Sequence, residues 1–108
     1  MGEGKLKGLR FNQGKRKWSL VDFKSLEPMV EVLEFGASKY GAFNWQRGLD
    51  KKEICESALR HMFAYLSGEK LDKESGLSHI GHMQCNLLFL AYMERMFIDI
   101  TKENNNEQ

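Results

Sequence analysis

The stretch LSHIGHMQCNLLFLAYMERMFIDI, at residues 77–100, decides the fold. As a helix it would be about 35 Å long at 1.5 Å per residue, and its apolar side chains would go almost all the way round. A helix that is apolar on most faces needs cover on most sides. Two companion helices from a chain of 108 residues do not supply that cover. The sequence therefore predicts self-association into a homodimer or a higher even oligomer, which completes a four-helix-type core.

Two amphipathic segments precede this stretch and predict an all-α protein with three main helices. The first helix is expected to have Ser25 as its N-cap and to end by Gly41. The second is expected to begin after Asp50, which can form a capping box with Glu53, and to stop at Gly68. The apolar residues of both segments recur at the helical period: Leu26, Met29, Val30, Leu33 and Ala37 in the first, and Ile54, Cys55, Ala58, Leu59, Met62, Phe63 and Leu66 in the second.

A basic arm precedes the helices. Residues 1–24 carry seven Lys or Arg and two acidic residues, a net charge of +5, whereas residues 25–98 carry eight basic and ten acidic residues, a net −2. The whole chain is nearly neutral at +1, which excludes a general nucleic-acid-binding protein, while the arm suits an anionic ligand such as phosphate. We expect one domain over residues 1–108: an irregular arm, with room for a short pair of strands, laid over a helical body at 25–100, and a frayed tail at 101–108.

The sequence also argues against several classes of protein and site. It has no run of about 20 apolar residues to span a membrane, and residues 1–5 lack the apolar stretch of a signal peptide, so we expect a soluble cytoplasmic protein. Cys55 and Cys85 form neither a disulfide framework nor a zinc-type pair, and both are expected to be small buried core residues. A Walker-type loop, a serine nucleophile elbow and a zinc cysteine set are missing as well.

Two glutamates on the first helix are candidate metal ligands. Glu31 and Glu34 are three residues apart and so share one helix face. They flank Leu33, which is expected to point toward the core, so at least one carboxylate should lie near the apolar seam. Such a pair offers oxygen ligands suited to Mg²⁺ or Mn²⁺. The alternative is two glutamates on a solvated surface.

Histidines mark the third helix and its neighbour. His79, His82 and Asn86 fall at i, i+3 and i+7 and form one stripe on the third helix, and His61 lies on the second helix beside Arg60. The stripe predicts either a polar functional cleft or a structural hydrogen-bond network. Imidazole offers a metal ligand or a proton carrier, and the asparagine amide offers a paired donor and acceptor.

Basic and aromatic residues complete the candidate site. Phosphate contacts are expected from Lys15, Lys17, Lys39 and Arg60, of which only arginine has a fork-shaped donor. Trp18 and Trp45 lie in non-helical segments, where each would either stack on a nucleobase or clamp its loop on the core.

Several strings in a fixed order resemble one family of small phage and prophage proteins. They are Phe11-Asn12-Gln13-Gly14-Lys15, Trp18-Ser19-Leu20, Leu33-Glu34-Phe35-Gly36-Ala37-Ser38-Lys39-Tyr40-Gly41, Asn44-Trp45 with Gly48, Ala58-Leu59-Arg60-His61, Gly68-Glu69, Asp72, Glu74-Ser75-Gly76-Leu77-Ser78-His79, and His82 with Asn86-Leu87-Leu88-Phe89-Leu90. Together they cover about residues 9–95. The family is that of dATP/dGTP diphosphohydrolase N-terminal domains, which is related to the MazG-like all-α nucleoside triphosphate pyrophosphohydrolases.

The resemblance implies an activity, a metal and a set of site residues. The activity is cleavage of a purine (deoxy)nucleoside triphosphate to the monophosphate and pyrophosphate. Mg²⁺ or Mn²⁺ would be held by Glu31 and Glu34 with His82 or Asn86, and Glu34 and His82 would be catalytic. The residues expected to bind the nucleotide are Lys15, Trp18, Lys39, Asn44, Trp45, Arg60, His61, Asp72 and His79.

One departure from the MazG pattern keeps a second function open. MazG-type enzymes carry a second acidic pair on another helix, and here Met83 and Asn86 stand in the corresponding apolar frame. Fewer carboxylates leave less charge to hold Mg²⁺ or to activate water. The alternative is therefore a phage protein that binds and sequesters a nucleotide, for example a host nucleotide signal, without hydrolysing it. A third hypothesis is a structural oligomer with a polar seam and no ligand.

Overall fold

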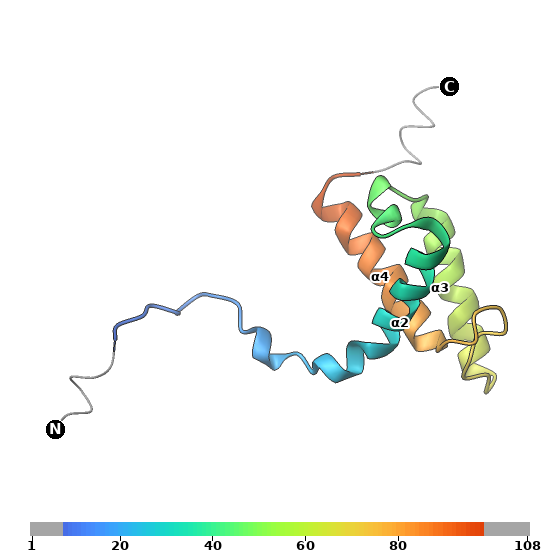
Figure 1. Ribbon diagram of the computed structural model, residues 1–108, viewed down its shortest axis with the longest axis horizontal. Coiled ribbons are helices and arrows are strands. Elements are labelled where there is room, and N and C mark those ends of the chain that lie inside the picture. The colour runs from blue at the N-terminus through green and yellow to red at the C-terminus, as the bar shows by residue number, and fades with distance from the viewer. Residues whose placement is uncertain (1–7, 99–108) are drawn as a thin grey trace.

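Three α-helices form the body of the protein. The computed structural model describes residues 8–98, in which α2 (Glu27–Tyr40), α3 (Lys51–Leu66) and α4 (His79–Arg95) are joined by loops, as Figure 1 shows. Short 3₁₀ turns occur at η1 (Trp18–Leu20), η2 (Phe23–Leu26) and η3 (Asn44–Arg47). Within residues 8–98 the only β pairing is one isolated bridge, between Leu71 and Ser78. The prediction of an all-α protein with three main helices is confirmed.

The helix α4 is central, because it packs against both α2 and α3. Six of its residues are buried: His79, Gly81, Met83, Cys85, Asn86 and Met93. The contact with α2 is closest at Gly81, where a Cβ atom would overlap the backbone carbonyl of Pro28. The absence of a side chain at Gly81 therefore sets how near α2 and α4 can approach each other.

The helix ends at Asp50 and Gly41 match the sequence, and the start of α2 differs from it. Asp50 caps α3, since its carboxylate accepts hydrogen bonds from the backbone amides of Lys52 at 2.8 Å and Glu53 at 3.4 Å. Gly41 ends α2 with a φ of 92°. The predicted capping of α2 by Ser25 is wrong, because the Ser25 hydroxyl donates to Asp22 instead and Leu26 takes the N-cap position without a side-chain bond.

The helix α4 is shorter than the predicted helix over residues 77–100. It begins at His79, because Ser78 adopts an extended N-cap conformation and its hydroxyl accepts from the amide of Gly81 at 3.2 Å. It ends at Arg95, and Phe97 follows with a left-handed φ of 57°, which cannot continue a helix. The remainder of the predicted helix at 99–100, and the predicted tail at 101–108, lie outside the described residues.

The arm does not lie over the helical body. From residue 8 it runs away from the helices, and it contains the turns η1 and η2 in place of a strand pair (Figure 1). Its apolar side chains, which could have held it on the helices, remain exposed: Leu9 by 88%, Phe11 by 85%, Trp18 by 71% and Leu20 by 82%. These few side chains are separated by glycines and charges, so the burial they offer is small compared with the entropy cost of ordering the segment.

The two cysteines have different surroundings. Cys85 is buried on α4, and its thiol donates to the Met29 carbonyl at 3.3 Å. Cys55 is exposed on α3, so the expectation that both are core residues is wrong for Cys55. None of the helices within residues 8–98 is long and apolar enough to cross a membrane.

Candidate functional site

A cleft of about 860 Å³ lies between α2, the segment around η3, α3 and the loop that joins α3 to α4. Eight of the residues predicted to act in function line it: Lys39, Asn44, Trp45, Arg60, His61, Asp72, His79 and His82. The packing of α2 and α3 on α4 brings these residues together from five segments: α2, η3, α3, the loop that joins α3 to α4, and α4 itself.

Three imidazole rings meet at one end of the cleft. His79 and His82 share a face in the first turn of α4, and His61 faces them from α3. The Nδ1 atoms of His61 and His79 are 2.8 Å apart. The rings of His61 and His82 are stacked, with centroids 4.4 Å apart and planes 3° from parallel. The predicted stripe is therefore part of a polar cleft and also of a hydrogen-bond network.

The loop between α3 and α4 adds a carboxylate to these rings. Backbone bonds fix the loop, among them Asp72 N–H to Leu77 O and Gly76 N–H to Asp72 O, both at 2.7 Å. Asp72 Oδ2 accepts from the amide of Ser75 at 2.9 Å and from its hydroxyl at 3.0 Å. The same hydroxyl oxygen lies 2.8 Å from His82 Nε2. Because the single hydroxyl proton goes to Asp72, His82 Nε2 must be the donor to Ser75.

A second carboxylate orients His79, which is only 2% exposed. Glu69 Oε2 lies 3.2 Å from His79 Nε2. Its other oxygen, Oε1, is buried and makes no hydrogen bond, although Lys73 Nζ is 3.9 Å away. A hydrogen bond to the carboxylate places the His79 proton on Nε2, so Nδ1 presents its lone pair toward His61.

The protonation of the cluster follows from its surroundings. Burial lowers the pKa of His61 below the ordinary 6.5, and the neighbouring His82 lowers it further. Burial also lowers the pKa of His82, against the opposing charge of Asp72. Burial alone would raise the pKa of Asp72, but hydrogen bonds from Ser75 hold it below the ordinary 3.8. At neutral pH the site thus combines uncharged His61 and His82 rings with an ionised carboxylate.

An aromatic wall of Phe43, Trp45 and Phe89 also lines the cleft. Trp45 stacks on Phe89 with ring centroids 5.1 Å apart, and meets Tyr92 edge-on at the same distance. Phe43, beside it, has a left-handed φ of 60°. Of the two interpretations of Trp45, the structure supports the clamp that holds the η3 segment on α4, while part of the residue still lines the cleft.

The predicted metal set Glu31, Glu34, His82 and Asn86 is not brought together. Glu31 and Glu34 are exposed and do not line the cleft, whereas Val32, between them in the sequence, is the residue that α2 buries. Asn86 is buried, and its amide donates to the Ser57 hydroxyl at 3.3 Å. Among residues 8–98, one group of three or more His, Cys, Asp or Glu residues has ligand atoms close enough together to hold a metal ion, and it consists of His61, Asp72 and His79.

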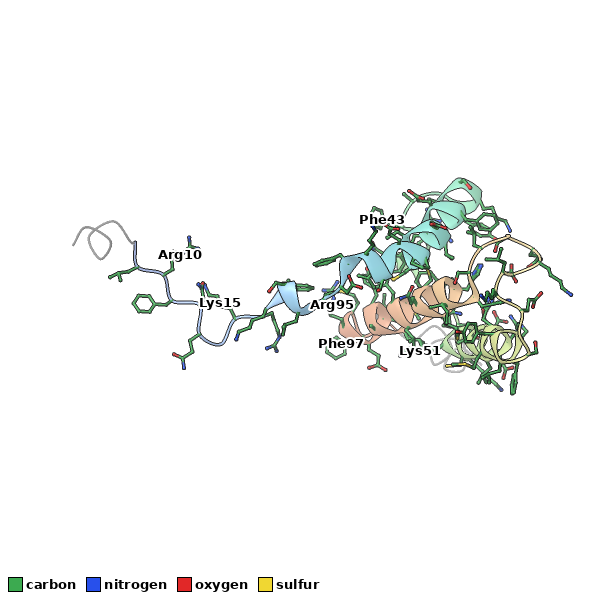
Figure 2. The ribbon with its side chains drawn as sticks, turned by 90° about the horizontal axis from the view of Figure 1, so that it is seen from below. Arg10, Lys15, Phe43, Lys51, Arg95 and Phe97 are labelled. Carbon is green, nitrogen blue, oxygen red and sulfur yellow. The ribbon has the colours of Figure 1, made fainter. Side chains whose placement is uncertain are left out.

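Two further predicted residues lie elsewhere, and two residues of the site were not predicted. Lys15 and Trp18 are on the arm, and Figure 2 shows Lys15 far from Phe43 at the cleft. Glu69 and Ser75 orient the cluster, and both stand in the strings that carry the family resemblance, but the sequence assigns neither a role in the site. A further signal is the polar turn in which Ser75 follows Asp72 by three residues, next to a histidine-bearing helix.

Comparisons with known proteins point to one family. The family described as dATP/dGTP diphosphohydrolase, N-terminal, matches residues 5–103. A protein of Salmonella phage PMBT28 named dATP/dGTP diphosphohydrolase is 35% identical over 86 residues, which cover 80% of this chain and 29% of the phage protein. The chain thus spans less than a third of the length of this relative. No solved structure matches the chain.

Proposed function

The chain belongs to the family of dATP/dGTP diphosphohydrolase N-terminal domains, and from this we propose that its cleft binds a purine (deoxy)nucleoside triphosphate and hydrolyses it to the monophosphate and pyrophosphate. One observation carries the proposal: a single cleft holds cations, an imidazole–carboxylate cluster and an aromatic wall. Its volume of about 860 Å³ falls within the roughly 300–1,000 Å³ usual for small-molecule sites.

Each part of the cleft suits one part of the nucleotide. Arg60, Lys39 and Lys73 line the cleft and supply positive charge for the phosphates. Trp45 and Asn44 offer a ring face and an amide to the base. The cluster of His61 and Asp72 can orient water and accept its proton as the water attacks the α-phosphorus. In that step a new P–O bond forms and the bond to the bridging oxygen breaks, so that pyrophosphate leaves.

A divalent cation, Mg²⁺ or Mn²⁺ in the enzymes that the sequence resembles, would supply charge neutralisation and a more acidic water. The pair Glu31 and Glu34 remains a prediction that rests on the MazG-like relationship. Both are exposed outside the cleft. We therefore assign the acid–base chemistry to residues inside the cleft, namely His61 and the neighbouring His82.

We also propose that the chain acts as a homo-oligomer in the cytoplasm of a phage-infected cell. Large apolar side chains remain exposed on α3, including Phe63 at 70% and Leu66 at 71%, and such a surface favours association. The extended arm of one copy would then be free to bring Lys15 and Trp18 to the cleft of another, which would explain why Lys15 lies far from the cleft of its own chain.

A second candidate function is binding without hydrolysis, and the comparison favours it specifically. Most of the phage relative's length, the 71% that this chain does not match, is free to carry the chemistry for which that protein is named. The positions that would hold a second acidic pair are the buried Met83 and Asn86. In this case the cleft holds the triphosphate and releases it intact.

One experiment separates the two functions. The purified chain is incubated with each dNTP and NTP in Mg²⁺ or Mn²⁺, and nucleotides are resolved by ion-exchange chromatography. We expect monophosphate and pyrophosphate from purine substrates, with the KM about tenfold higher for Arg60→Ala and unchanged for Arg47→Ala, which is exposed and outside the cleft. Intact nucleotide recovered from the bound complex would support sequestration, and absence of binding would refute both.

A further inference from the structure

We propose that His61, Asp72 and His79 form a binding site for a first-row transition-metal dication of the series Mn²⁺ to Zn²⁺. The inference deepens the proposed function and rests on it for what the metal would do, whereas metal binding itself can be measured without any nucleotide. Nothing in the family name or in the sequence resemblance assigns a metal to these three residues.

The three ligand atoms come from three segments and lie within 4.8 Å of one another. Opposite ligands of a transition metal are about 4.2 Å apart when each bond is about 2.1 Å, so the widest separation needs to close by at most about 0.6 Å. The two Nδ1 atoms, 2.8 Å apart, would subtend about 84° at such an ion, close to the right angle between neighbouring ligands of an octahedral shell.

The surrounding groups hold the ligands in the state that a metal requires. Glu69 accepts from His79 Nε2–H, which leaves the Nδ1 lone pair free to bind. Metal-bound histidines very often have such a carboxylate on the far ring nitrogen. Ser75 holds Asp72 in place through two hydrogen bonds to one oxygen, Oδ2. The site is therefore oriented on two sides by groups that do not themselves need to contact the metal.

The ligand types select the metal. Two imidazole nitrogens and one carboxylate oxygen suit ions from Mn²⁺ to Zn²⁺, whereas Mg²⁺ prefers an all-oxygen shell and keeps most of its water. Three protein ligands leave further positions open. His61, Asp72 and His79 all line the cleft, so the open positions face the space where the phosphates would lie. The ligand set thus places this metal at the proposed reaction centre.

The competing explanation is a hydrogen bond between the two rings. An N–H···N bond has the same 2.8 Å length and would require a proton on Nδ1 of His61. In that arrangement the rings bind each other and Asp72 serves only to fix the loop. A direct measurement of metal binding distinguishes the two explanations, since the hydrogen bond needs no ion.

The test uses the tag-free chain after EDTA treatment and gel filtration. Co²⁺ is titrated while its d–d absorption is recorded, and Zn²⁺ and Mg²⁺ are titrated by calorimetry. We expect one Co²⁺ or Zn²⁺ per chain, bound at least tenfold more tightly than Mg²⁺. His61→Gln and Asp72→Asn should each weaken binding at least tenfold, and Glu69→Gln about 10–100-fold. Circular dichroism of the metal-free variants checks their folding, and Glu69→Gln tests the site even where a ligand variant unfolds.

Two control variants keep their metal if the assignment is right. Glu56→Gln removes an exposed carboxylate of α3, the helix that carries His61. The double variant Glu31→Gln, Glu34→Gln removes the pair suggested by the resemblance. The proposal is overturned if the wild type binds neither Co²⁺ nor Zn²⁺, if Mg²⁺ binds as tightly, or if loss of binding follows the double variant. Metal binding without nucleotide turnover would refute only the proposed hydrolysis. Mg²⁺-dependent turnover without Co²⁺ or Zn²⁺ binding would refute only the proposed metal site.

Discussion

Replacing Gly81 with alanine should destabilise the protein, although alanine is the better helix former. The added Cβ would overlap the Pro28 carbonyl oxygen and lie 2.7 Å from its carbon and 3.1 Å from the Pro28 Cβ. Most of these atoms belong to the backbone, so α2 itself has to move. Overpacking of this kind costs about 1–3 kcal/mol, against a gain of at most about 1 kcal/mol in helix propensity. We expect a net loss of about 1–2 kcal/mol in the free energy of unfolding.

Gly36→Ala is the matched control for this prediction. Gly36 also lies inside a helix, α2, but no heavy atom comes within 4 Å of a Cβ built there. Its replacement should therefore stabilise the protein by about 0.5–1 kcal/mol. Urea unfolding followed by circular dichroism measures the change in the free energy of unfolding for both variants. A Gly81→Ala variant as stable as Gly36→Ala would refute the close packing of α2 on α4.

Three other predictions concern charge, reactivity and assembly. The pKa values of His61 and His82 are lowered in the fold, so just below pH 6.5 the unfolded chain binds more protons than the folded one, and the free energy of unfolding should fall as the pH drops below 6.5. The slope of this free energy against pH, measured from urea midpoints, should be smaller in the double variant His61→Gln, His82→Gln. An unchanged slope would contradict the lowered pKa values of the two histidines. Burial raises the pKa of Cys85 to about 12, so iodoacetamide should modify the exposed Cys55 at once and Cys85 only on unfolding, as mass spectrometry would show. Light scattering should give twice the chain mass of 12.5 kDa or an even multiple, and Phe63→Glu should lower it toward the monomer; a folded monomeric wild type would contradict the proposed association.

The fold was largely predictable because its signals are local. Asp50, Gly41 and Gly68 act on their own neighbours, and all three mark helix ends as expected. The end of α4 was not predictable, because Met96, Phe97 and Ile98 continue the apolar pattern. There the left-handed turn at Phe97, supported by the bond from Ile98 N–H to the Met93 carbonyl at 2.9 Å, overrides the pattern.

The pairing of His79 with His82 was predictable because the two residues share an element. The spacing of His79 and His82 fixes them on one face whatever the tertiary structure. The position of Leu33 between Glu31 and Glu34 predicts a carboxylate near the apolar seam, yet both glutamates are exposed. The apolar pattern also includes Val30, which is 44% exposed, whereas the residue that α2 buries is Val32. Two valines two residues apart cannot be distinguished by hydrophobicity. Only packing against α4 decides which of them faces inward.

The cluster also links the site to the stability of the fold. His79 is almost fully buried at the start of the helix that forms the core, and a buried polar group without partners costs about 1–3 kcal/mol. Within residues 8–98 its two ring nitrogens find partners only in Glu69 and His61, so the residues that orient the ring also prevent that cost. A metal bound to Nδ1 of His79 would replace the contact between this atom and Nδ1 of His61. Because such an ion binds only the assembled cluster, it would add about 2.7 kcal/mol to the stability at a free concentration of 100 times its Kd. The first turn of α4 is therefore the place where a ligand would act on the whole helical body.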